Sequence, residues 1–227
     1  YMLIFWNHGG GSTSGVCFDE TADYDGLTIH EINDVLYNFT EANPDFHLDL
    51  IGFDACLMAT YEAAAHMQYY ADFMVASEEL EPSLGWNYAW LNALGENPVL
   101  DAQGIGVAIA DAYMEACMDE NPDDYLSMSV LYLPAMDYLV STMETYASYL
   151  SQALDAGQLS TFSRARQRMY AFGDFDSATS DMVDMMALID GTRTIAPQTA
   201  DVLQTAYERV VRYNVCLLYT SDAADDL

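Results

Sequence analysis

The sequence predicts an α/β fold, in which helices flank a mostly parallel β-sheet. Short apolar runs typical of buried strands alternate with segments of helical periodicity along the 227 residues. The intervening helices allow the right-handed crossovers that join parallel strands. Apolar residues make up 52% of the chain and aromatic residues 13%, which is enough for a buried core.

The first elements follow from local signals. The apolar run 1–7 predicts a buried strand that ends at Asn7-His8 and three glycines, and residues 9–26 predict a polar loop. Thr28 to Glu31 fits a capping box, which predicts a helix to about residue 43, before Pro44. Residues 47–53 predict a second strand.

Later elements follow from the same rules. Residues 57–70 predict an Ala- and Met-rich helix, directly after the turn Asp54-Ala55-Cys56. The other expected elements are a strand at 73–77, a helix at 101–119, a strand at 127–133, a helix from Pro134 to about 156, and a mostly helical segment 160–213 with starts at Ser180 and Pro197.

Charge restricts the partners. The 36 acidic residues against 6 basic ones give a formal charge of -30, and such a surface repels phosphate backbones and anionic headgroups. We therefore expect no nucleic-acid or membrane partner, and expect basic peptides or divalent cations instead. The alternative is that acidity only keeps a secreted or halotolerant protein soluble. No apolar run reaches the ~18 residues of a membrane span.

The two ends predict an incomplete domain. The chain opens inside an apolar run without an initiating Met, so we expect residues 1–215 to form one domain truncated at the N-terminus and at the C-terminus. Residues 216–227 resemble a translated sequencing adapter and are expected to be non-native. A natural polar tail is the alternative.

His8 and Cys56 are the candidate catalytic residues. Both follow consecutive predicted strands, whose carboxyl ends meet at one sheet edge when strands run ~4.8 Å apart. A helix beginning at Leu57 would favour a Cys56 thiolate. The N–H groups of Gly9 and Cys56 are candidate oxyanion donors, and His8 is the candidate acid-base group. Each residue taken singly also has an alternative role: the cysteine as an inert packing residue, and the histidine as a hydrogen-bonding residue at a strand end.

Three motifs carry a family resemblance. They are Trp6-Asn7-His8-Gly9-Gly10-Gly11, Gly52 to Ala59, and Ala76-Ser77-Glu78-Glu79 through Gly85-Trp86-Asn87-Tyr88. Together they resemble the clostripain (C11) cysteine peptidases, relatives of caspases. The resemblance implies a caspase-like three-layer sandwich, a His8–Cys56 dyad, and cleavage after Arg or Lys. It also implies a secreted or envelope location in a bacterium, and calcium as a cofactor in some members.

Asp54 is the candidate for recognising a basic substrate side chain. If strand geometry persists to Cys56, the Asp54 carboxylate lies on the same face as the nucleophile and beside it. Alternatively, Asp54 caps the N-terminus of the helix predicted from Leu57 onward. Trp86 and Asn87 are candidate pocket residues, with a core role as the alternative for the aromatic ring. A catalytically inactive family member that binds basic peptides in an acidic cleft is the competing function.

Overall fold

The computed structural model describes residues 1–96, 99–120, 125–173 and 182–217. The chain divides into two compact units, Tyr1–Leu133 with Val211–Leu227, and Pro134–Val210. All the candidate site residues belong to the first unit. The prediction of one truncated domain over 1–215 stays a prediction.

A five-stranded sheet forms the centre of the first unit. Its order is β1 (Met2–Trp6), β4 (Leu48–Asp54), β5 (Ala71–Ala76), β6 (Ser127–Tyr132) and β7 (Val211–Cys216). The strands β1, β4 and β5 run parallel, and β6 is antiparallel to both of its neighbours. Four of the five strands therefore point the same way, which confirms a mostly parallel sheet.

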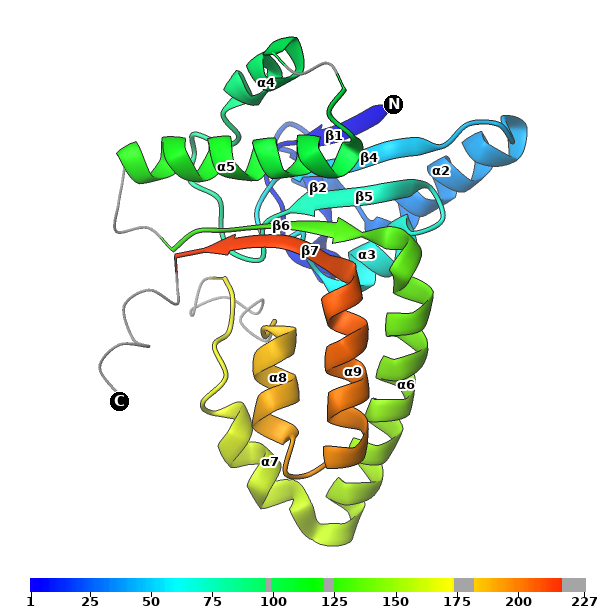
Figure 1. Cartoon of the computed structure of the whole chain (residues 1–227), viewed down its shortest axis with the longest axis vertical. Coiled ribbons are helices and arrows are strands. Elements are labelled where there is room, and N and C mark those ends of the chain that lie inside the picture. The colour runs from blue at the N-terminus through cyan, green and yellow to red at the C-terminus, as the bar shows by residue number, and fades with distance from the viewer. Residues whose placement is uncertain (97–98, 121–124, 174–181, 218–227) are drawn as a thin grey trace. The chain divides into compact units, whose positions relative to one another are not determined.

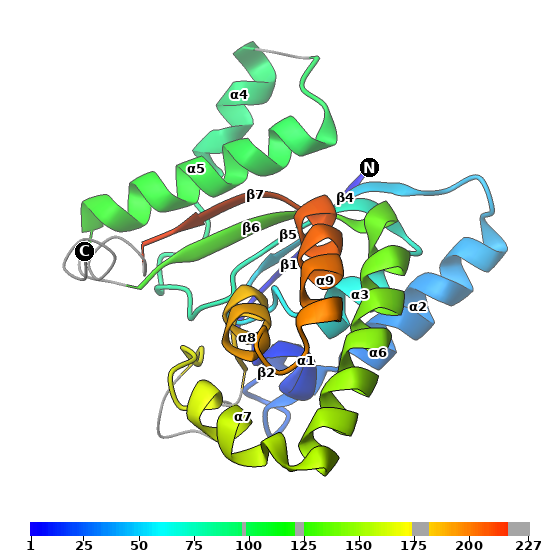
Figure 2. The ribbon, with the colours of Figure 1, turned by 60° about the horizontal axis from the view of Figure 1, so that its bottom comes forward.

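Helices cover both faces of this sheet. The long helix α5 (Ala102–Glu120) packs on one face, and α2 (Ile29–Ala42) and α3 (Tyr61–Met67) lie on the other (Figures 1 and 2). The Thr28 capping box is present, because its hydroxyl accepts from the Glu31 N–H and the Glu31 carboxylate accepts from the Thr28 N–H. The predicted three layers and the first helix are confirmed.

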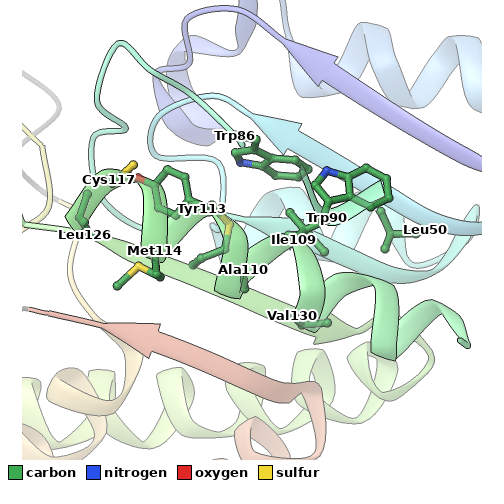
Figure 3. Packing of buried hydrophobic residues seen from close by; sticks show 12 residues of the cluster. Leu50, Trp86, Trp90, Ile109, Ala110, Tyr113, Met114, Cys117, Leu126 and Val130 are labelled. Carbon is green, nitrogen blue, oxygen red and sulfur yellow. The ribbon is translucent and has the colours of Figure 1, made fainter. Parts of the chain in front are cut away.

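The main core lies between α5 and the sheet. Trp86 and Trp90 pack with Ile109, Tyr113 and Val130 in a cluster of buried side chains (Figure 3). Gly52 makes room for this packing, since a Cβ there would lie 2.9 Å from the Trp86 ring. The Trp86 segment is thereby held against the strand that leads to Cys56.

Three local predictions were wrong. Residues 9–26 are not one loop but contain α1 (Gly11–Ser14) and a small antiparallel sheet of β2 (Val16–Asp19) and β3 (Asp25–Leu27). The strand β1 is an edge strand whose residues are half-buried or exposed rather than fully buried. Residues 211–216 form β7 rather than helix, because their side chains alternate between the covered and the open face of the sheet.

The second unit is helical. It contains α6 (Met136–Ala153), a π-helical segment η3 (Leu154–Gln158), α7 (Leu159–Arg166), α8 (Met185–Thr192) and α9 (Pro197–Val210). The start at Pro197 is confirmed, and a short 3₁₀ turn, η2 (Leu133–Ala135), precedes α6. Asp184 caps α8, and Ser180 lies outside the described residues. Among the described helices, none has the length and apolar character that a membrane crossing requires.

Candidate active site

The turn after β4 presents Cys56. The strand ends at Asp54, Ala55 and Cys56 lie in the turn, and Leu57 has a φ of +66°. A buried non-glycine residue in this left-handed region is strained, and such strain is common at functional sites. The condition that strand geometry extends from Asp54 to Cys56 is therefore not met.

Cys56 does not begin a helix, contrary to the sequence prediction. The helix α3 begins at Tyr61, where the Thr60 hydroxyl accepts from the Ala63 N–H at 3.2 Å. The segment between donates instead to the loop after β5, from Leu57 to the Glu79 carbonyl (3.2 Å) and from Ala59 to the Ser77 carbonyl (2.8 Å). No helix dipole therefore favours the Cys56 thiolate, and the alternative role of Asp54 as a helix cap is also wrong.

The loop that follows β5 is fixed by two buried serines. The Ser127 hydroxyl on β6 accepts from the Glu78 N–H at 2.9 Å and from the Glu79 N–H at 3.1 Å. Ser77 lies 3.2 Å from Ser127 and also accepts from the Glu79 N–H, at 3.0 Å. Buried hydrogen bonds of this kind hold a loop in one conformation. They place Glu81 against the Cys56 turn.

Three backbone N–H groups surround the Cys56 sulfur. The Glu81 N–H donates to Sγ at 3.2 Å, and the N–H groups of Gly9 and Cys56 itself also face the sulfur. The thiol lies 3.8 Å from the Glu81 carbonyl. Burial nevertheless raises the pKa of Cys56, and the negative charge of Glu81 raises it further against these donors. The resting group is a thiol.

The loop after β1 approaches Cys56 closely. A Cβ on Gly9 would lie 2.3 Å from the Cys56 carbonyl oxygen, so only glycine allows this approach. The His8 carbonyl accepts from the Cys17 N–H at 3.0 Å, which ties the loop to β2. The His8 side chain is exposed, and among the described residues its imidazole has no hydrogen-bond partner.

Asp54 is a buried carboxylate beside this turn. It is 2% exposed, and it accepts from the Trp86 backbone N–H and from the Tyr88 hydroxyl, each at 2.9 Å. Burial raises the pKa of Asp54 while these hydrogen bonds lower it. Tyr88 is 41% exposed, so its hydroxyl joins the buried carboxylate to a side chain at the surface.

Glu81 adds a second carboxyl group. Its Oε1 accepts from the Trp86 indole N–H at 3.4 Å, and its Oε2 is buried without a well-aligned partner among the described residues. Burial raises the pKa of Glu81 well above its usual range, and the neighbouring Asp54 charge raises it further. Glu81 thus touches the nucleophile through its backbone and the Asp54 site through its side chain.

The sequence match identifies the family to which this arrangement belongs. The model of the Clostripain family matches residues 1–223. The chain belongs to the clostripain family. Its relatives are cysteine proteases, and the α/β fold is the caspase-like fold of the C11 proteases.

A curated relative is clostripain of Hathewaya histolytica, 34% identical over 106 residues. That match covers 39% of this chain and 19% of the relative. The matched segment therefore spans about a fifth of that clostripain.

Solved clostripain-family structures share the fold. A secreted C11 cysteine protease from Bacteroides thetaiotaomicron, in complex with an irreversible peptide inhibitor, is 18% identical with a TM-score of 0.71. An inactive zymogen C11 protease from Parabacteroides distasonis is 17% identical with a TM-score of 0.62. The matches cover 95% and 98% of this chain, and 57% and 59% of those chains.

In this clostripain-family chain the structure places the Gly9 backbone against Cys56 and joins Asp54 to Trp86, whereas no hydrogen bond among the described residues joins the His8 imidazole to Cys56. Trp86 is a core residue that binds both acids through its N–H groups. The Asn87 side chain accepts from the Ala89 N–H at 3.0 Å and so caps the 3₁₀ turn η1 (Tyr88–Trp90), and its place in a substrate pocket stays a prediction.

Sequence reasoning did not single out Glu81 or Tyr113. Glu81 is one of three glutamates in a loop without periodicity, so no pattern distinguishes the one that points inward. Tyr113 reaches the site from α5, where its spacing indicates only a core residue.

Calcium binding finds no support in the described residues. They contain no group of three or more His, Cys, Asp or Glu side chains arranged to hold a metal ion. The acidic pair Asp123-Asp124 lies outside them.

Proposed function

We propose that the chain is a cysteine endopeptidase that hydrolyses peptide bonds after Arg or Lys. The observation that carries this is the convergence of the Gly9, Cys56 and Glu81 N–H groups on the Cys56 sulfur. Preorganised donors beside a nucleophile stabilise the negative charge that develops on the substrate oxygen. The family supplies the reaction class.

In the proposed chemistry, His8 takes up and returns a proton twice. His8 takes the thiol proton of Cys56, the sulfur attacks the scissile carbonyl carbon, and the oxyanion accepts from the Gly9 and Cys56 N–H groups. The His8 imidazolium gives its proton to the leaving amine, which leaves an acyl-enzyme. His8 next removes a proton from water, whose attack on the thioester releases the acid and restores the thiol. Because the imidazole is exposed and has no hydrogen-bond partner in the described part of the chain, it is free to turn toward the sulfur.

Asp54 is our candidate for binding the basic side chain. It is a buried carboxylate two residues from the nucleophile, and a cation that replaces the Tyr88 hydroxyl at Oδ2 forms a charge-assisted bond there. Another clostripain-family structure, at 14% identity with a TM-score of 0.58, is described in complex with the peptide inhibitor BTN-VLTK-AOMK. We propose polypeptides with basic residues as substrates and an extracellular or envelope location.

The test uses matched reporters and variants. We expect hydrolysis of an arginyl reporter, complete loss in Cys56→Ala and His8→Ala, and retention in Cys17→Ala, which removes another half-buried thiol. Asp54→Asn is expected to reduce cleavage of the arginyl reporter far more than cleavage of its citrullinyl analogue. Equal loss for both reporters contradicts the specificity role.

Two observations favour a second function. The raised pKa of Cys56, and a His8 imidazole without a hydrogen-bond partner among the described residues, are also what an inactive member that binds basic peptides would show. Binding of arginyl peptides without turnover, with and without added calcium, supports that function against the peptidase.

A further inference from the structure

The proposed function gives Asp54 a role in binding but leaves its buried partner Glu81 without one. The two carboxyl groups share Trp86, whose backbone N–H donates to Asp54 and whose indole N–H donates to Glu81. The remaining Glu81 oxygen, Oε2, is buried and lacks an aligned partner in the part of the chain that the structure describes. A buried carboxyl group with an unpaired oxygen is either protonated, or ionised in a site that is built to receive a cation.

Positive charge is scarce around this pair. The sequence has no lysine, and the only arginine within the first unit is Arg212. Its guanidinium lies 4.8 Å from the centre of the Tyr132 ring. Two ionised carboxylates in one buried site repel each other strongly, so one of them takes up a proton when no cation is near.

The other titratable groups facing Glu81 cannot supply that charge. Asp54 from β4, Cys56 from the turn, Tyr88 from η1 and Tyr113 from α5 all interact with it electrostatically. Each is neutral when protonated and negative when not. Burial raises the pKa of Tyr88 and of Tyr113, so both phenols stay neutral at ordinary pH.

We propose that Asp54 and Glu81 hold one proton between them in the empty site, and that a basic side chain bound at Asp54 releases it. The Glu81 O–H bond breaks, its electrons stay on the carboxylate, and the proton passes to solvent. The pair then carries two negative charges against the bound cation. This inference rests on the proposed role of Asp54 and makes Glu81 a positioning residue that couples substrate charge to pH.

The raised pKa of Glu81 agrees with this arrangement. The linkage between cation binding and proton release determines whether the affinity rises or falls with pH. Cation binding favours the ionised pair, so the affinity for a basic ligand rises with pH. Between the Glu81 pKa values of the bound and the empty site, the dissociation constant falls about tenfold per pH unit.

The experiment is calorimetry on the Cys56→Ala chain, which binds without turnover. An acetylated Ala-Arg amide is titrated in two buffers of different ionisation enthalpy, from pH 5 to 8. We expect the release of about one proton per peptide bound. The Glu81→Gln variant is expected to release none and to bind with an affinity independent of pH. Glu78→Gln, which removes the same charge from the same loop, is the control and is expected to behave as the parent.

A second measurement uses the unsubstituted protein and therefore does not depend on whether a variant folds. Infrared difference spectra of protein labelled with ¹³C at the glutamate carboxyl groups report a protonated glutamic acid by its C=O band. We expect one such band to persist at neutral pH in the empty protein and to disappear when the arginyl peptide binds.

Three results overturn the proposal. They are equal proton release by the parent and Glu81→Gln, absence of the protonated band at neutral pH, and failure of the arginyl peptide to bind at any pH. Failure of the peptidase function looks different. In that case proton release on binding is observed in the Cys56→Ala chain, while the unmodified chain hydrolyses nothing.

Discussion

Replacing Gly9 with alanine tests whether the loop after β1 forms part of the active site. The added Cβ would lie 2.3 Å from the backbone carbonyl oxygen of Cys56, and 3.1 Å and 3.2 Å from Ala55 Cβ and the Cys56 nitrogen. Real Cβ atoms rarely approach below about 3.4 Å, so the loop or the turn must move by about 1 Å. None of the three contacts is with the end of a flexible side chain, so the backbone must shift.

That displacement has two separate consequences. Overpacking a close backbone contact lowers the free energy of unfolding by about 1–3 kcal/mol. The same movement draws the Gly9 N–H away from the sulfur and changes the place of His8. Loss of one oxyanion donor reduces kcat by about 10²–10³, and a misplacement of about 1 Å alone reduces the rate by about 10². We therefore expect kcat to fall by about 10²–10³ with a modest loss of stability.

The assay is kcat and KM for the arginyl reporter, beside thermal and urea unfolding. Gly95→Ala is the control for glycine replacement, because a Cβ at this position in α4 (Leu91–Glu96) meets nothing within 4 Å. Folded Gly9→Ala protein with the kcat of the parent would refute the reasoning, since the loop would then not approach Cys56 as described.

Four further outcomes are expected. Alkylation of Cys56 by iodoacetamide, followed by mass spectrometry, should be slow at neutral pH and accelerate with pH beyond 9, because burial raises its pKa; pH-independent labelling contradicts this. Glu81→Gln should become more stable than the parent as pH rises above about 4.3, because ionisation of the buried acid opposes folding of the parent. The gain is about 1.4 kcal/mol for each pH unit by which the pKa of Glu81 in the folded protein exceeds that in the unfolded chain. Equal dependence of the two unfolding free energies on pH contradicts this. Gly52→Ala should lose about 1–3 kcal/mol in urea unfolding, because its Cβ would lie 2.9 Å from the Trp86 ring. Asp184→Asn should keep the stability of α8, because asparagine caps as well without a buried charge, whereas Asp184→Ala should lose about 1 kcal/mol.

Elements with local signals were predictable from the sequence. The Thr28 capping box fixes the start of α2, and Pro197 fixes the start of α9, because each signal acts within one turn of the helix it begins. The strand β4 was predicted within one residue at each end, since a run of apolar residues bounded by charged ones admits little else. The position of Cys56 after this strand followed directly.

The immediate surroundings of Cys56 were not predictable, because they depend on distant residues. Leu57 to Ala59 have the composition of a helix, yet their N–H groups donate to carbonyls of the loop after β5. That loop is held in turn by Ser127, which lies some seventy positions beyond the nucleophile. A local propensity of a few tenths of a kcal/mol per residue cannot compete with several buried hydrogen bonds. The predicted helix N-terminus at Cys56 was lost for this reason.

A thiol with a raised pKa is compatible with a peptidase that acts on basic substrates. Two effects oppose the Cys56 thiolate, first burial and then the negative charge of Glu81. In the proposed exchange, the cation that binds at Asp54 is balanced by the negative charge that Glu81 acquires when it loses its proton, so the net charge beside the sulfur does not change. The substrate charge therefore does not lower the pKa of Cys56, and the thiol proton passes to His8 during the attack. The preference for Arg or Lys is then expressed in KM rather than in kcat, because the charge acts on binding and not on the reacting sulfur.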